Sequence, residues 1–325
     1  MKKFYIRRPE MFDEAAKGKP KGLLKTLLTF LLFYIIASFV EIIIPTAVAF
    51  VDGIRLAAQG ATDAELSDNL LLNNLPFKIA TLFSSIFSII GAIIYCVFIE
   101  NRNLSSMGVK KEHAVRNFLI GGLIGVIMFI AVVLVNVLLG GMTFEGFNVN
   151  VSFGLILVFF AGFIINRMSA VFIFNGCLMN GIGGRHNMAA AVLISSAIFT
   201  AIYFGNSGMG VIAAVNLMLI MIFGALFMIC FDNIWGVCAI HSLWYFMQDS
   251  IFGIKVTGIE IQGNTTSLFS VTQTEGKELI NGGEFGADGG LGATIVLLVS
   301  LALLIVYMIK TDKAGFAEKT ASENT

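Results

Sequence analysis

Charged residues are scarce in this sequence. Asp, Glu, Lys and Arg together make up 13% of the 325 residues, whereas they make up roughly a quarter of a soluble domain. Basic and acidic residues balance, so the formal net charge is zero and no broad basic surface suggests nucleic acid as a partner. Hydrophobic residues account for 57%, and the mean hydropathy is +0.87. This composition excludes an ordinary soluble protein and predicts an integral membrane protein embedded in a lipid bilayer.

Proline and cysteine are also rare, with four of each. The small number of prolines favours long, uninterrupted helices. All four cysteines lie in apolar runs, and no two of them have the Cys-x-x-Cys spacing of a redox or metal-binding pair. We therefore expect buried thiols without a disulfide framework. The predicted fold class is all-α, with several membrane-spanning helices.

Long apolar runs separated by polar loops predict about eight transmembrane helices, each near the ~20 residues that cross a hydrocarbon core ~30 Å thick. The spans are expected at residues 23–51, 77–99, 118–139, 151–180, 188–204, 210–231, 234–253 and 291–309.

Basic residues mark one side of this membrane domain. They occur in the N-terminal arm (1–22), in the 100–116 loop, at Arg185 and in the C-terminal tail (311–325). The positive-inside rule then places both termini in the cytoplasm and the largest polar loop, 254–290, outside. The predicted organisation is a basic arm, a membrane domain over residues 23–310 and a cytoplasmic tail. The glycine-rich end of the outside loop, with Glu284 and Asp288, is expected to be a solvated turn.

Polar residues interrupt the fourth to seventh spans. A guanidinium at membrane depth costs at least about 2.5 kcal/mol, so Arg167 is expected to face a protein interior and to pair with Glu41, a backbone carbonyl or a pocket asparagine. His241 and Tyr245 lie four residues apart and therefore share a helix face. Tyr245 is thus a possible hydrogen-bond partner for a buried His241. Interhelical hydrogen bonds alone would explain any one of these side chains. Their concentration in consecutive helices instead predicts a shared polar pocket between spans 4, 5, 6 and 7. Its candidate residues are Asn166, Arg167, Asn175, Phe199, Tyr203, Asn216, His241 and Tyr245.

Three segments carry most of these residues: SAVFIFNGCLMN (169–180), SSAIFTAIYF (195–204) and WGVCAIHSLWYF (235–246). Their order, spacing and flanking residues resemble the CAAX protease and bacteriocin-processing family (CPBP, also called Abi), whose motifs are EExxxR, FxxxH and HxxxN or HxxxD. The resemblance covers residues 70–310 and implies an intramembrane endopeptidase fold of about eight helices. In that family, paired glutamates and histidines activate a water, with zinc in at least some members.

Most catalytic positions of the family are replaced in this chain. His241 is retained as the first residue of the third motif. The other five positions hold residues of different chemistry: Ala170 and Val171 for the two glutamates, Asn175 for the arginine, Tyr203 for the histidine of the second motif and Tyr245 for the asparagine. Alanine and valine offer neither a base nor a ligand, and a catalytic zinc usually needs three protein ligands. We therefore expect no metal and no cofactor, whereas an active protease would imply zinc.

Three functions remain open from the sequence. The first is a proteolytically inactive protein that binds membrane proteins or peptides through the family's substrate cleft, as a scaffold, a regulator or a bacteriocin-immunity protein. The alternative is an active intramembrane metalloprotease that processes CAAX proteins or bacteriocin leaders. The third is a small-molecule transporter with Arg167 and the pocket asparagines as ligands, although the sequence has no internal repeat of the kind common in transporters. The resemblance also implies a bacterial plasma membrane.

Overall fold

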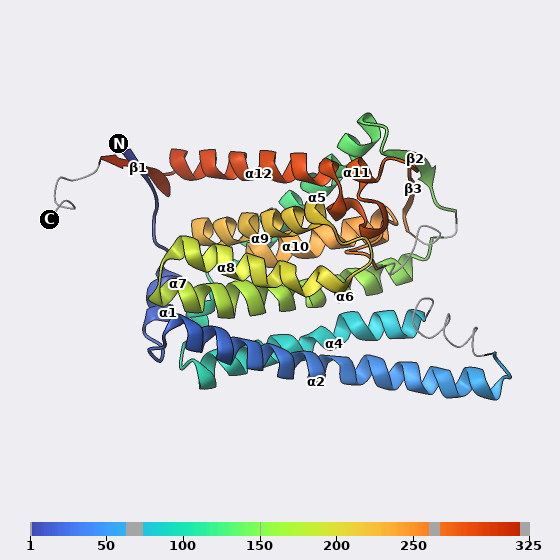
Figure 1. The fold of residues 1–325 in the computed structure, drawn as a ribbon, viewed down its shortest axis with the longest axis horizontal. Coiled ribbons are helices and arrows are strands. Elements are labelled where there is room, and N and C mark those ends of the chain that lie inside the picture. Colours follow the sequence, from blue (N-terminus) through green and yellow to red (C-terminus); the bar gives the residue numbers. More distant parts are fainter. Residues whose placement is uncertain (1, 63–73, 150, 260–266, 319–325) are drawn as a thin grey trace.

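The computed structural model describes residues 2–62, 74–149, 151–259 and 267–318. Long helices run side by side along the longest axis of the molecule, and short strands lie at its two ends (Figure 1). Within the described residues, seven helices are long and apolar enough to cross a membrane. The prediction of an all-α polytopic membrane protein is therefore confirmed.

These helices follow the expected spans closely. The seven segments are α2 (Leu23–Ala58); α4 (Leu75–Ile94) with a π-helical turn, η1 (Tyr95–Ile99); α5 (Ala114–Leu138); α6 (Phe153–Ala170) with a π-helix, η3 (Val171–Met179), and α7 (Asn180–Arg185); α8 (Met188–Ala201) with a 3-10 turn, η4 (Ile202–Gly205); α9 (Val211–Phe231); and α12 (Leu291–Lys310). The sequence predicts that the first span ends at Val51, but α2 continues to Ala58. In this extension Asp52 accepts a hydrogen bond of 2.9 Å from the Asn74 side chain at the start of α4.

The expected seventh span is α10 (Trp235–Phe246), continued by a π-helical turn, η5 (Met247–Ile251). This segment is shorter than most of the other spans and packs against α5, α6 and α9. Every residue from Gly236 to Ser242 is buried. Along most of its length α10 therefore contacts protein, so polar side chains on it can be sheltered from lipid.

The two ends of the chain meet at one end of the bundle (Figure 1). Strand β1 (Lys2–Ile6) pairs antiparallel with β4 (Ala314–Glu318). Helix α1 (Glu10–Ala16) packs against α7, so the N-terminal arm is part of the folded structure. Both termini consequently lie on the same side of the helices.

The opposite end of the bundle is closed by a folded loop. Strand β2 (Met142–Phe147) pairs antiparallel with β3 (Phe269–Gln273). The chain then forms α11 (Glu278–Asn281) and a glycine-rich segment that leads into α12.

Most of this glycine-rich segment is buried and only Glu284 in it is exposed, so the prediction of a solvated turn is wrong. Asp288 is 3% exposed and Phe285 is fully buried. Gly282 and Gly286 have φ values of 85° and 89°, which a residue with a Cβ rarely adopts, and these turns let the backbone pack closely. A high content of glycine with acidic residues describes a loop in water and a tightly packed backbone equally well. Sequence composition therefore could not distinguish the two.

Asp288 connects the loop before α12 to α10. Its Oδ1 atom accepts a hydrogen bond of 2.9 Å from Trp244 Nε1. Burial raises the pKa of Asp288 to about 6, although the Trp244 hydrogen bond acts in the opposite direction. The loop is thus fastened to the helix that carries His241 and Tyr245.

Candidate functional site

The segment that resembles the first family motif lies in a π-helix. Helix α6 changes its hydrogen-bonding pattern over η3, and all nine residues of η3 are buried. Such π-helical segments are rare overall, but those that occur are often found at functional sites. Because they shift the register of the helix, the spacing of an ideal α-helix no longer predicts which side chains share a face. Val171 lies at the beginning of η3, and the half-buried Ala170 is the last residue of α6.

Arg167 is at the centre of the polar interior. It lies in the last turn of α6 and is 7% exposed, which confirms the prediction that it is buried. The guanidinium carbon stands 3.8 Å from the centroid of the Tyr245 ring on α10. Its NH1 group donates a long hydrogen bond of 3.4 Å to the Tyr203 hydroxyl. In the described part of the chain Arg167 forms no salt bridge, and none of the three expected partners (Glu41, a backbone carbonyl or a pocket asparagine) accepts a hydrogen bond from it, so the predicted pairing is wrong.

Glu41 belongs to a different polar cluster, between α2, α4 and α6. Its carboxylate accepts hydrogen bonds from the hydroxyls of Ser85 and Ser88, the first at 2.5 Å. Asn166 donates to the Ser85 hydroxyl at 2.8 Å. Consecutive residues of a helix point about 100° apart, so Asn166 faces α4 while Arg167 faces the interior. The inclusion of Asn166 in the pocket around Arg167 is therefore wrong.

Asn216 has a structural role near the start of α9. Its side-chain amide donates to the backbone oxygens of Asp288 and Gly290, at 2.8 and 2.9 Å. Its Oδ1 atom accepts a hydrogen bond of 2.7 Å from Thr294. Because these bonds use its donors and its acceptor, Asn216 fixes the loop before α12, and the prediction that it is a free pocket ligand is wrong.

His241 is 1% exposed and is directed towards α9. A Cβ placed on Gly224 would lie 3.0 Å from His241 Nε2, which shows how closely the ring approaches this helix. Among the described residues, neither ring nitrogen has a hydrogen bond of normal geometry, and the Tyr245 hydroxyl has none either. The predicted hydrogen bond between His241 and Tyr245 is therefore wrong. The two residues share α10, but Tyr245 packs beneath Arg167 whereas His241 packs against Gly224.

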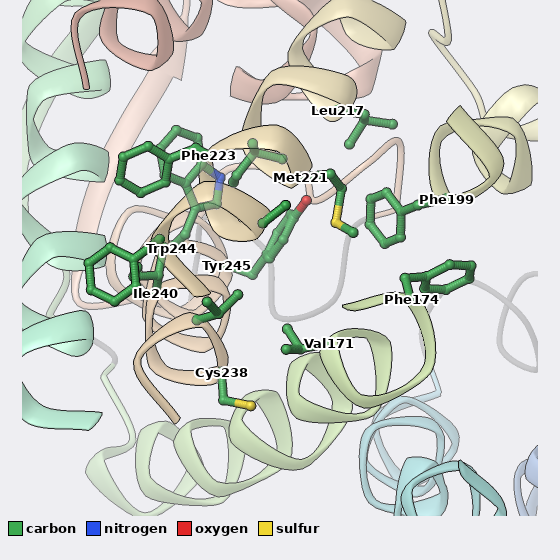
Figure 2. Packing of buried hydrophobic residues seen from close by; sticks show 14 of the residues in the cluster. Val171, Phe174, Phe199, Leu217, Met221, Phe223, Cys238, Ile240, Trp244 and Tyr245 are labelled. Carbon is green, nitrogen blue, oxygen red and sulfur yellow. The ribbon is translucent and has the colours of Figure 1, made fainter. Parts of the chain in front are cut away.

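Aromatic contacts bring the first two motif segments together. The rings of Phe174 and Phe199 meet edge to face with centroids 5.3 Å apart, and Phe199 and Tyr203 are 5.2 Å apart. Figure 2 shows Phe174 and Phe199 as neighbours and the Tyr245 hydroxyl pointing towards Met221. Asn175 is fully buried, but its amide nitrogen reaches only the sulfur of Met179, at 3.9 Å. The structure thus joins Tyr203 and Tyr245 through Arg167 and leaves Asn175 and His241 outside that contact.

Several polar atoms in this interior have no protein partner among the described residues. Burying such an atom without a hydrogen bond costs about 1–3 kcal/mol, so each has a hydrogen-bonding capacity that the described protein groups do not meet. The residues that contribute them are Arg167 (Nε), Asn175 (Oδ1), Ser195, Ser196 and Tyr245. Sequence reasoning missed the two serines, although adjacent hydroxyls in an apolar run were a usable signal.

This set of side chains combines one fixed positive charge with phenol, amide and hydroxyl groups. The buried carboxyl of Asp288 interacts electrostatically with Arg167 and Tyr245 but is hydrogen-bonded to Trp244. Across the described ranges, no group of three His, Cys, Asp or Glu side chains is placed to hold a metal. The residues around His241 therefore do not fit the zinc that an active member of the resembled family would need.

Comparison with known proteins adds no relative to this description. No protein-family model matches the chain. A search of curated proteins also finds no match. The function is therefore inferred from the chemistry of the interior around Arg167.

Proposed function

We propose that this protein is a membrane-embedded binding protein that resembles CPBP intramembrane proteases but lacks their chemistry. Its ligand is an extended segment of another membrane protein or a peptide, which enters the interior between α6, α8 and α10. The observation that carries this proposal is Arg167, a buried guanidinium whose described hydrogen-bond and cation–π partners are two tyrosines, with the buried Asp288 carboxyl acting on it from beyond salt-bridge distance. A scaffold, a regulator and a bacteriocin-immunity protein would all use such a site.

The physical reason is the unmet hydrogen-bonding capacity of Arg167. A guanidinium has five N–H donors, and charge-assisted hydrogen bonds to carbonyl or carboxylate oxygens are roughly twice as strong as neutral ones. Arg167 Nε has no partner, and the bond from NH1 to Tyr203 is long. A peptide carbonyl or a terminal carboxylate would satisfy these donors. The half-buried Tyr203, in η4 at the outer end of α8, lies where such a ligand would enter.

Two observations support an inactive protein over an active metalloprotease. Ala170 and Val171 stand where the family has its paired glutamates, and neither can hold or activate a water. His241 packs against Gly224 of α9, and among the described residues neither of its ring nitrogens has a hydrogen-bond partner. The protease alternative would need a different set of residues.

The function can be tested by photo-crosslinking in native membranes. We expect benzoylphenylalanine at Phe204, which is 66% exposed and adjoins Tyr203, to form an adduct with a peptide or membrane protein. The matched control is benzoylphenylalanine at Val211, which is 82% exposed at the start of α9. Adding Arg167→Gln should weaken the adduct at Phe204 by about tenfold, because it removes a charged donor worth roughly 1.5–3 kcal/mol. Arg167→Lys keeps the charge and should retain part of the adduct.

Two outcomes would contradict this proposal. One is an adduct at Phe204 that persists at full yield in a folded Arg167→Gln protein. The other is about one zinc per chain in the purified protein, lost in His241→Ala together with peptide cleavage. The second outcome would establish the protease alternative.

We also propose that the end of the bundle with both termini faces the cytoplasm of a bacterial plasma membrane. The support is the charge at that end, where Lys21, Arg102, Arg185 and Lys110 gather. A cysteine at the exposed Thr272 of β3 should react with an impermeant maleimide in intact cells, whereas a cysteine at the exposed Lys111 should not. The four native cysteines are buried and should contribute little background. The reverse labelling pattern would invert the topology.

A further inference from the structure

An apolar groove runs along the membrane-facing side of α5, α9 and α12. Its volume is about 480 Å³. Most of its lining is aliphatic or aromatic and includes Ile124, Phe227, Phe231 and Leu303. None of its lining residues is among those described as contacting Arg167, so it is independent of the function proposed above.

One end of this groove carries a free cation. Arg116, in the first turn of α5, lines the groove and is exposed. Within the described part of the chain its side chain forms no ion pair and no hydrogen bond. The first turn of α5 lies at the same end of the bundle as the last turns of α9 and α12, which is the end that bears both termini (Figure 1). A cation at this position sits at the level of lipid headgroups.

Tyr307 completes the polar end of the groove. Its ring stacks on Phe231 with centroids 5.8 Å apart, and Phe231 in turn packs on Phe227 at 4.5 Å. These rings form a stiff aromatic wall that ends in a phenol group, an arrangement typical of the membrane interface. Lys310 follows Tyr307 by three residues on the same face of α12 and is also exposed.

The length of the groove matches one lipid leaflet. Arg116 and Ile127 both line it, and eleven residues of α-helix extend about 16 Å. This is about half of a hydrocarbon core of ~30 Å, which is the depth that one acyl chain occupies.

We propose that this groove binds an anionic phospholipid. The phosphate lies between Arg116, the Tyr307 hydroxyl and Lys310, and one acyl chain lies along Ile124, Phe227 and Leu303. A zwitterionic lipid brings its own quaternary ammonium and leaves the charge of Arg116 unbalanced, whereas an anionic headgroup neutralises it. Charge complementarity at one end and apolar surface along the rest therefore select this lipid class.

A second apolar groove in the molecule serves as a control for the preference for headgroup charge. A second groove of about 490 Å³ runs between α2 and α4, and its lining contains no charged residue. Ile36 and Ile90 are among its lining residues. This α2–α4 groove should accept acyl chains without preference for the charge of the headgroup.

Native mass spectrometry of the purified full-length protein can test the proposal. The probes are dioleoylphosphatidylglycerol and dioleoylphosphatidylcholine, which have the same chains and differ in net charge. We expect tighter binding of phosphatidylglycerol, and Arg116→Gln should weaken that binding about fivefold while leaving phosphatidylcholine unchanged. Arg116→Lys should restore most of the preference. Lys25→Gln, which removes an exposed cation at the start of α2, should leave it intact.

The apolar part of the site needs its own variant. Ile124→Trp fills the α5–α9–α12 groove and should reduce phosphatidylglycerol binding at least fivefold, whereas Ile36→Trp in the α2–α4 groove should not change the headgroup preference. The proposal is overturned if folded Arg116→Gln or Ile124→Trp protein binds phosphatidylglycerol like the parent. It also fails if millimolar inorganic phosphate alone displaces the lipid, because the acyl chain would then contribute nothing.

Discussion

Replacing Glu100 with alanine is expected to lower the free energy of unfolding by about 3–5 kcal/mol, because it leaves buried cations without their shared counter-charge. Glu100 follows η1 and is 1% exposed. Its carboxylate accepts hydrogen bonds from Lys21 Nζ at 2.6 Å and from Arg185 NH1 at 2.7 Å, and Arg102 Nε lies 4.0 Å away. All three basic side chains are at least nine-tenths buried. Denaturant titration in detergent micelles would measure the loss.

Two further variants separate charge from packing at this cluster. Glu112→Ala removes an exposed carboxylate on the same side of the membrane domain and should change stability by less than about 0.5 kcal/mol. Glu100→Gln keeps the shape of the side chain but not its charge, so it should remain clearly destabilised. If Glu100→Ala unfolds like Glu112→Ala, the arm that carries Lys21 is not docked as the structure shows.

The contribution of Glu100 should also depend on pH. Burial alone would raise the pKa of Glu100, but the hydrogen bonds from Lys21 and Arg185 outweigh it and hold the pKa below its ordinary value of 4.5. A carboxyl whose pKa is lowered on folding adds stability above pH 4.5 and loses it as the pH falls through the folded-state value. The difference in stability between the parent and Glu100→Gln should therefore shrink as the pH is lowered from 4.5.

The membrane-spanning architecture was predictable, because hydropathy reports directly on burial in lipid. Every expected span corresponds to a helix, including the buried α10. The docking of the N-terminal arm was not predictable. A run of Lys and Arg indicates a side of the membrane but does not identify a protein partner. Lys21 hydrogen-bonds to Glu100, which is 79 residues away in the sequence. Such pairing depends on the three-dimensional arrangement of helix ends.

The interior of the bundle was predicted in character but not in its contacts. Hydropathy and the cost of burying a guanidinium were enough to place Arg167 inside. They could not identify its partners, because Glu41, a backbone carbonyl and a pocket asparagine were all open, whereas the structure has Tyr245 and Tyr203. The π-helix η3 adds a second obstacle, because it changes the side-chain directions beyond Val171 and leaves Asn175 without a link to Arg167. Residue patterns identify faces of helices, whereas partners depend on how those helices are rotated and packed.

Helices α5 and α10 approach each other closely, which fixes the position of α10 beside the Arg167 interior. This contact was not predicted from the sequence. A Cβ on Gly121 would overlap the carbonyl oxygen of Gly236 and lie 2.8 Å from its carbonyl carbon. A Cβ on Gly125 would lie 2.6 Å from the carbonyl oxygen of Ile240. Gly121 and Gly125 have the G-x-x-x-G spacing that lets membrane helices approach closely. That spacing was visible in the sequence, but it does not say which helix is the partner.

Gly121→Ala is expected to lower the free energy of unfolding by about 3 kcal/mol, at the upper end of the usual range for overpacking. The reason is that the new methyl group meets backbone atoms of Gly236, which cannot rotate away, so α5 and α10 must separate. The matched control is Gly122→Ala, whose Cβ would meet Leu243 and Ala239 at 3.7 and 3.9 Å, in ordinary contact. This control should be neutral or slightly stabilising, because alanine favours a helix by about 0.5–1 kcal/mol relative to glycine.

The same pair of variants tests whether this contact also holds Tyr245 under Arg167. Separation of α5 from α10 would move Tyr245, which lies on α10 and is 3.8 Å from the Arg167 guanidinium. Gly121→Ala should therefore weaken the crosslinked adduct at Phe204 under conditions where the variant remains folded, and Gly122→Ala should not. Equal unfolding free energies for the two variants would show that the helices are farther apart than described. A destabilised Gly121→Ala protein with an unchanged adduct would show that the binding interior does not depend on the position of α10.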